Sequence, residues 1–139
     1  MKTLLFCFLS LSCHGASITF SSNPSPLTIT QAIPGRNPLC VIDTSTTCDL
    51  IVSPKKTVTI LAALDSPLPP HTTLKIGLFF PHQKSSLFSL GPTPQPITSP
   101  IPEGFYNSIC VTYEYAATVA AGVIPPQTKT IFFTLLEKE

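Results

Sequence analysis

Residues 57–80, which run TVTILAALDSPLPPHTTLKIGLFF, decide the fold class of this chain. Apolar side chains occupy every second position at each end of the stretch. Successive side chains of a β-strand point to opposite faces, so this period of two predicts half-buried strands over Thr57–Leu64 and Thr73–Phe80. Residues 65–71 include three prolines. They cannot form a helix or a central strand, so we expect them to connect the two strands as an antiparallel pair.

The same alternation appears on both sides of this stretch. Towards the C-terminus it predicts strands over Ile109–Val119 and Lys129–Leu136. Towards the N-terminus, shorter candidates are Ser17–Ser21, Leu27–Ile33 and Asp49–Val52, separated by turns that contain proline. The chain has 16 prolines and no tryptophan, and prolines interrupt helices. About seven short strands with proline-rich turns predict an all-β, two-sheet sandwich of the immunoglobulin-like kind.

Length and charge restrict the organisation and the partners. With 139 residues the chain has room for one domain, and 43% hydrophobic residues suffice for an ordinary core. Charged residues make up 11%, and the formal net charge is +1. Such a chain has no strong field to attract nucleic acid, so we predict no nucleic-acid partner.

The N-terminal residues 1–15 have the pattern of a signal peptide. Lys2 supplies a positive start, Leu4–Leu11 form a short apolar stretch, and cleavage is expected after Gly15. The mature domain would then cover residues 16–139. A second hypothesis makes Cys13 a lipid attachment site. No later apolar run reaches the roughly 18 residues of a membrane span, so we expect a secreted or extracytoplasmic protein with no transmembrane span in the mature chain.

Three cysteines follow the predicted leader: Cys40, Cys48 and Cys110. Cys40 and Cys48 are close in sequence, and the turn-forming residues Asp43 and Ser45 lie between them. We therefore expect a Cys40–Cys48 disulfide that closes a small loop. Cys110 is expected to be a buried free thiol in a strand.

Side chains with catalytic or metal-binding patterns are scarce. His71 and His82 each adjoin a proline in predicted turns, without a second histidine or a cysteine at ligand spacing. Neither a Gly-x-Ser-x-Gly motif nor a glycine-rich phosphate loop occurs. We predict that the protein is not an enzyme and uses no cofactor and no metal.

Aromatic residues occur in adjacent pairs, namely Phe79-Phe80, Phe105-Tyr106 and Phe132-Phe133. Neighbours in a strand point to opposite faces, so one member of each pair needs a second apolar environment. Three environments fit: a core on both faces, an interface, or a cavity between splayed sheets. The proline-rich segment Gly91–Pro102 is either a structural crossover between sheets or a functional loop.

Two parts of the sequence resemble the ML lipid-recognition domain. Cys48–Leu64 is similar to that family's second-to-third-strand region. Its closing half is similar to Pro102–Tyr106, Tyr113–Tyr115, Val123–Pro126 and the alternating Lys129–Leu136. The likeness extends over Cys40–Leu136, without the family's usual last strand and terminal disulfide. It implies a secreted sandwich whose sheets part to admit an acyl chain, a sterol or a glycolipid, and it places the family's small-loop disulfide at Cys40 and Cys48.

The leading functional hypothesis is a secreted, non-catalytic protein that holds a lipid or another apolar molecule between its sheets. The candidate lining is apolar and lies on the predicted inner faces of the strands: Ile76, Leu78, Phe80, Val111, Tyr113, Ile131 and Phe133. The alternative hypothesis is an extracellular immunoglobulin-like interaction module, with or without a lipid anchor at Cys13, that binds a protein partner.

Overall fold

The computed structural model describes residues 17–20, 22–27, 40–81, 83–84, 86–122 and 124–138. The predicted signal peptide lies outside the described residues, and so do positions 28–33 of the strand predicted over Leu27–Ile33. Leu27 itself lies in a loop. The following account concerns the described part of the chain.

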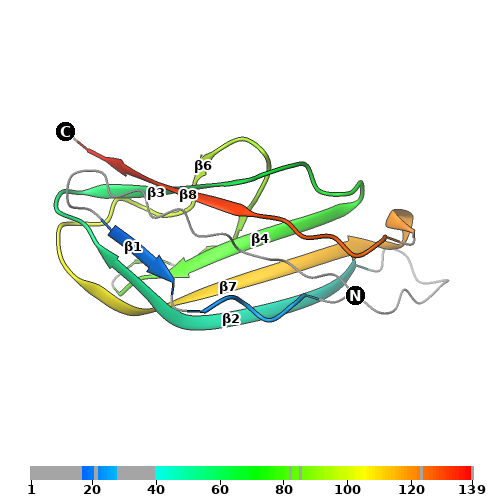
Figure 1. Cartoon of the computed structure of the whole chain (residues 1–139), viewed down its shortest axis with the longest axis horizontal. Helices are drawn as coiled ribbons and strands as arrows, with labels where there is room; N and C mark the ends of the chain where they lie inside the picture. Colours follow the sequence, from blue (N-terminus) through cyan, green and yellow to red (C-terminus); the bar gives the residue numbers. More distant parts are fainter. Residues whose placement is uncertain are drawn as a thin grey trace.

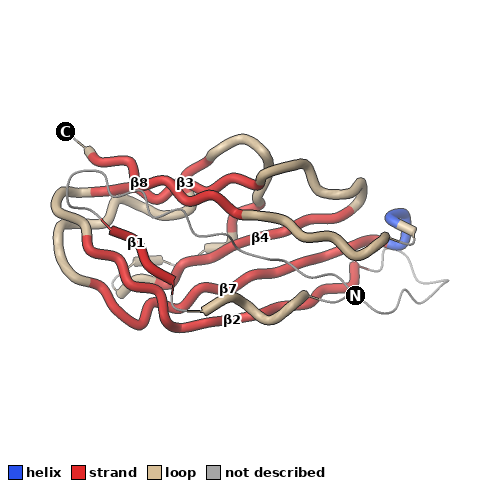
Figure 2. Tube along the Cα trace, viewed as in Figure 1, coloured by secondary structure: helices blue, strands red, loops and turns tan. Residues whose placement is uncertain are grey.

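Two β-sheets make up the fold, so the predicted all-β sandwich is confirmed (Figure 1). The first sheet has five strands in the order β1-β2-β7-β4-β5, and the second has three in the order β6-β3-β8. The strands are β1 Ser17–Phe20, β2 Cys40–Ser53, β3 Val58–Leu64, β4 Thr72–Phe79, β5 Phe88–Ser89, β6 Gln95–Pro96, β7 Tyr106–Thr118 and β8 Ile131–Glu137, and a short 3-10 turn covers Val119–Ala121. Figure 2 shows loops at both ends of the sandwich and further loop segments that run alongside the strands.

The strands β3 and β4 do not form the expected antiparallel pair. β3 pairs with β8, with Ala62 opposite Phe133, whereas β4 pairs with β7, with Ile76 opposite Tyr113. The connection 65–71 therefore crosses from one sheet to the other. Lys129 holds it in place by donating hydrogen bonds to Ser66 Oγ at 2.7 Å and to the Pro67 carbonyl at 2.9 Å. The alternation identified both apolar rows correctly, but it does not distinguish strands that lie side by side from strands that face each other across a core.

The predicted Cys40–Cys48 disulfide is wrong, because Cys48 is bonded to Cys110. Cys40 and Cys48 both belong to β2, which also includes the predicted turn residues Asp43 and Ser45. At about 3.3 Å per residue, eight positions along a strand separate two Cα atoms by roughly 26 Å, far beyond the reach of a disulfide of about 7 Å. The prediction of a free Cys110 thiol is also wrong, because Cys110 is bonded to Cys48.

A β-bulge positions the disulfide. The register between β2 and β7 shifts between Thr47, which lies opposite Val111, and Leu50, which lies opposite Ile109. Two residues of β2 thus face the single Cys110 of β7. The Cα atoms of Cys48 and Cys110 lie 3.8 Å apart, and Cys48 is exposed. The covalent bond therefore joins two adjacent strands at the surface of the five-stranded sheet.

The segment Gly91–Pro102 is a crossover between the sheets. It follows β5 of the five-stranded sheet, contributes β6 to the three-stranded sheet, and leads back to β7 of the first. Near its end Ile101 and Val58 exchange backbone hydrogen bonds of 2.9 and 2.7 Å. The structural interpretation of this segment is thus confirmed, and the bridge fixes the position of its last residues.

Candidate functional site

The predicted lining residues come together in the interior of the sandwich. Ile76 and Val111 are 0% exposed, and Tyr113 and Ile131 are 1% exposed. Leu78 and Phe80 are also buried, whereas Phe133 is half-buried and packs against Phe20 of β1 with ring centroids 4.8 Å apart. Six of the seven belong to one buried apolar cluster, and Phe133 packs against that cluster. Binding of a lipid there stays a prediction.

A pocket lies at the end of the sandwich where β4 ends and β7 begins. Its volume is about 270 Å³. The lining comes from the residues after β4, from the end of the crossover and from the start of β7: Phe80, Pro81, Gln83, Pro100, Ile101, Pro102 and Tyr106. The rings of Phe80 and Tyr106 meet edge to face, with centroids 5.6 Å apart and an interplanar angle of 81°. This geometry is the preferred one for aromatic pairs.

Hydrogen bonds hold the walls of this end pocket. Gln83 Nε2 donates to the Pro100 carbonyl at 3.1 Å, and the Tyr106 hydroxyl donates to the Pro102 carbonyl at 3.1 Å. Prolines have no backbone N–H and a fixed φ, so these two carbonyls are held on a stiff segment. The Ile101–Val58 bridge fixes the same segment from the inner side. The pocket is therefore preformed, with apolar walls and two polar side chains.

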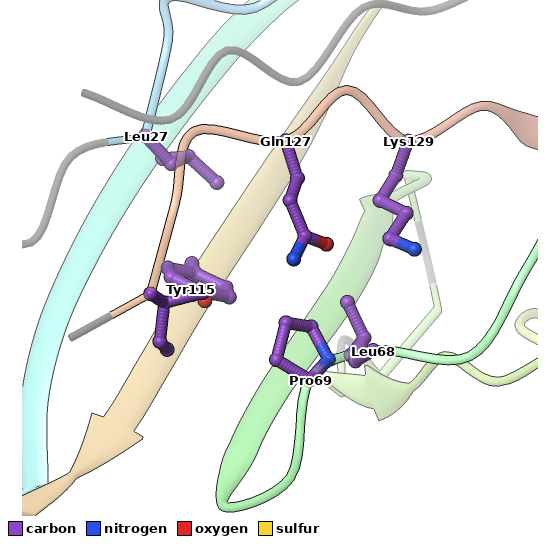
Figure 3. A pocket seen from close by; sticks show the side chains of 7 residues that line it. Leu27, Leu68, Pro69, Tyr115, Gln127 and Lys129 are labelled. Carbon is purple, nitrogen blue, oxygen red and sulfur yellow. The ribbon is translucent and has the colours of Figure 1, made fainter. Parts of the chain in front are cut away.

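A smaller cavity lies at the opposite end of the sandwich (Figure 3). Its volume is about 30 Å³. The lining combines an N-terminal segment, the β3–β4 connection, β7 and the segment before β8: Leu27, Leu68, Pro69, Tyr115, Ile124, Gln127 and Lys129. A space of this size corresponds to about one water molecule. It is too small for an organic ligand.

The half-buried carboxylate of Asp49 influences the buried phenol of Tyr113. Asp49 of β2 accepts a hydrogen bond from Ser22 Oγ through Oδ2, and its Oδ1 is buried without a hydrogen-bond partner. Burial, together with the nearby negative charge of Asp49, raises the pKa of the Tyr113 hydroxyl above its ordinary value. Both effects disfavour a phenolate, so Tyr113 is neutral at physiological pH.

The raised pKa of Tyr113 predicts a loss of stability in alkali. The unfolded chain loses the tyrosine proton near pH 10, whereas the folded chain retains it to higher pH. The contribution of this group is thus fully present below about pH 10 and falls as the pH rises further. Urea unfolding at a series of pH values should show a steeper alkaline decline for the natural chain than for Tyr113→Phe. Equal declines would contradict the prediction.

Other chemically active groups are dispersed. His71 is exposed in the turn before β4, and His82 lies outside the described residues. In the described ranges no three histidine, cysteine or acidic side chains gather where they could hold a metal ion. No helix in the same part of the chain is long and apolar enough to cross a membrane.

No family model, no curated protein and no solved structure significantly matches this chain. The resemblance to the ML domain therefore stays a prediction. Of the predicted lining residues, only Phe80 reaches the end pocket. The sequence contained two signals for this pocket, the proline-rich segment and the Phe105-Tyr106 pair, but their convergence with Gln83 depends on the crossover between sheets.

Proposed function

We propose that the protein is a secreted, non-catalytic, immunoglobulin-like interaction module whose end pocket receives an apolar anchor residue of a protein partner. One observation carries this proposal: the side chains between the sheets are buried in one apolar cluster, whereas an apolar pocket of about 270 Å³ is open at the loop end. Loops at the end of a sandwich commonly form its binding surface.

The dimensions and the surroundings of the pocket suit an aromatic or proline side chain. A cavity of about 150 Å³ suffices for benzene, so the end pocket has room for one ring with its backbone. The adjoining Phe105 is 67% exposed. Aromatic anchors that fill a pocket, with further aromatic residues around them, are typical of the energetic centres of protein interfaces. The seven lining residues carry no charge, which favours an uncharged anchor.

Export is part of the proposal and has two supports. The first is the predicted signal peptide. The second is the Cys48–Cys110 disulfide, because disulfides form and persist mainly in oxidising compartments outside the cytosol.

Titration of the isotopically labelled chain with single-residue probes tests the proposed pocket. N-acetyl-tryptophanamide and N-acetyl-prolinamide are expected to bind with a Kd of about 1 mM, a realistic affinity for a fragment. The amide resonances of Gln83, Ile101 and Tyr106 should shift. Tyr106→Ala should weaken binding by about ten-fold through the lost ring contact and hydrogen bond.

Phe132→Ala is the matched control, because Phe132 is an exposed aromatic residue on β8, outside the pocket lining. It should leave the affinity for both probes unchanged. If Tyr106→Ala left the affinity for both probes unchanged, this pocket would be excluded as their binding site. Uptake of palmitate, with shifts at Ile76 and Val111 instead, would favour the lipid hypothesis.

A further inference from the structure

The strand β8 is an edge of the three-stranded sheet. Among the described residues it pairs on one side only, with β3. Its sequence from Ile131 to Leu136 contains no charged residue and no proline. Sheet edges are normally protected by such residues, because an unpaired edge is a template for another strand. The edge of β8 lacks that protection over Ile131–Leu136.

The direction of the backbone groups along β8 follows from two hydrogen bonds at its ends. Asp65 N donates to the Thr130 carbonyl at 3.0 Å, and Lys138 N donates to the Thr57 carbonyl at 2.8 Å. The even-numbered residues of this segment therefore bond to the β3 side. In an antiparallel ladder the intervening residues point their N–H and C=O groups the other way. These residues are Ile131, Phe133, Leu135 and Glu137. A second extended strand that lies beside β8 is the structure that pairs all of these N–H and C=O groups.

The two charges that flank the edge are complementary to each other. Lys129 and Glu137 lie at equal distances in sequence from Phe133. An antiparallel pair of β8 strands with Phe133 on the two-fold axis thus places Lys129 of each copy opposite Glu137 of the other. The same register pairs Ile131 with Leu135 and uses the outward-pointing backbone groups of both strands. If the axis moved to Thr134, Glu137 would lie opposite the apolar Ile131.

We propose that a second copy of this chain pairs with the free edge of β8, antiparallel and with Phe133 on the two-fold axis. The three-stranded sheets of the two copies then join into one continuous sheet of six strands. In this pairing two exposed apolar side chains of each copy lie beside the strand of the other copy and become covered. They are Phe132, which is 42% exposed, and Leu136, which is 56% exposed. This interface is separate from the end pocket, so the two proposals stand or fall independently.

The polar groups at the ends of β8 have unused hydrogen-bonding capacity that suits this dimer. Glu137 Oε1 is buried without a hydrogen-bond partner. Lys129 Nζ carries three N–H donors and uses two of them, on Ser66 and Pro67. The third can be donated to the Glu137 carboxylate of the second copy once that side chain turns from its buried position towards the edge. By symmetry this ion pair occurs twice in the dimer.

Light scattering on the purified natural chain, combined with size-exclusion chromatography, tests the proposal. The expected mass is twice that of the protomer. Glu137→Lys creates two pairs of like charges and should weaken the dimer by about ten-fold or more. Exchange of the charges in the double variant Lys129→Glu, Glu137→Lys should restore the dimer. Glu103→Lys, an equal change of charge in an exposed loop, is the control and should leave dimerisation unchanged.

A backbone variant tests the edge itself. Leu135→Pro removes an N–H that points away from β3, so it should abolish the dimer while circular dichroism shows a folded sandwich. A natural chain that is monomeric throughout the micromolar range would overturn the proposal. A dimer that survives both Glu137→Lys and Leu135→Pro would overturn it as well, since its interface must then lie elsewhere.

Discussion

The double variant Cys48→Ala, Cys110→Ala is expected to lose about 4 kcal/mol of unfolding free energy by the chain-entropy estimate. The two cysteines lie 62 positions apart, so their bond closes a long loop in the unfolded chain. The loss of that constraint increases the entropy of the unfolded state. The disulfide also joins β2 and β7 beside a bulge, where the regular ladder is interrupted. Urea unfolding of the oxidised natural chain and of the variant measures the difference.

Two comparisons make this experiment specific to the observed pairing. Reduction of the natural chain should lower its stability to that of the double variant. The Cys40→Ala variant should retain the stability of the natural chain. If Cys40→Ala proved as damaging as Cys48→Ala, while Cys110→Ala had no effect, the pairing of Cys40 with Cys48 would be correct after all.

The Ile76→Ala variant is expected to lose about 2–5 kcal/mol, the usual cost of removing a large aliphatic side chain from a packed core. Ile76 is 0% exposed on the inner face of β4, opposite Tyr113 of β7. The buried cluster to which it belongs has members from both sheets, so the space left by the substitution cannot close without moving a strand. Thermal and urea unfolding measure the loss.

Ile42→Ala is the matched control for Ile76→Ala. Ile42 belongs to the same sheet but is 53% exposed, so its truncation should change the stability by less than about 0.5 kcal/mol. The packed-core hypothesis and the ligand-cavity hypothesis predict opposite effects of Ile76→Ala on stability. A side chain that lines a ligand cavity would lose bound lipid on truncation and leave the stability of the empty protein nearly unchanged. That outcome would contradict the packed core and favour the lipid hypothesis.

Local pattern predicted the strands well where one face is apolar and the other is polar. The strands predicted over Thr57–Leu64 and Thr73–Phe80 correspond to β3 and β4 within one or two residues. The pattern failed over the first part of β2, where Asp43 and Ser45 suggested a turn. Those side chains are half-buried on β2, which is stabilised by its long pairing with β7. Tertiary pairing there outweighed the local preference of Asp and Ser for turns.

The candidate site was harder to predict because its parts are distant in sequence. The proline-rich segment was identified as a crossover or a functional loop, and it proved to be the crossover that also supplies one wall of the pocket. Gln83 had no distinguishing pattern around it. Its role depends on its contact with the Pro100 carbonyl, 17 positions away.

The sequence by itself determined the all-β class and which side chains form the apolar rows, because the alternation of side chains along a strand is a local property of the backbone. The tertiary structure alone decided that β3 and β4 face each other from different sheets, that Cys48 bonds to Cys110, and that Gln83 and Tyr106 line the same end pocket. Each of these outcomes depends on which strands become neighbours. The neighbours of each strand are those that bury the apolar rows of all strands at once. Residues 57–80 therefore predict two strands without predicting their partners.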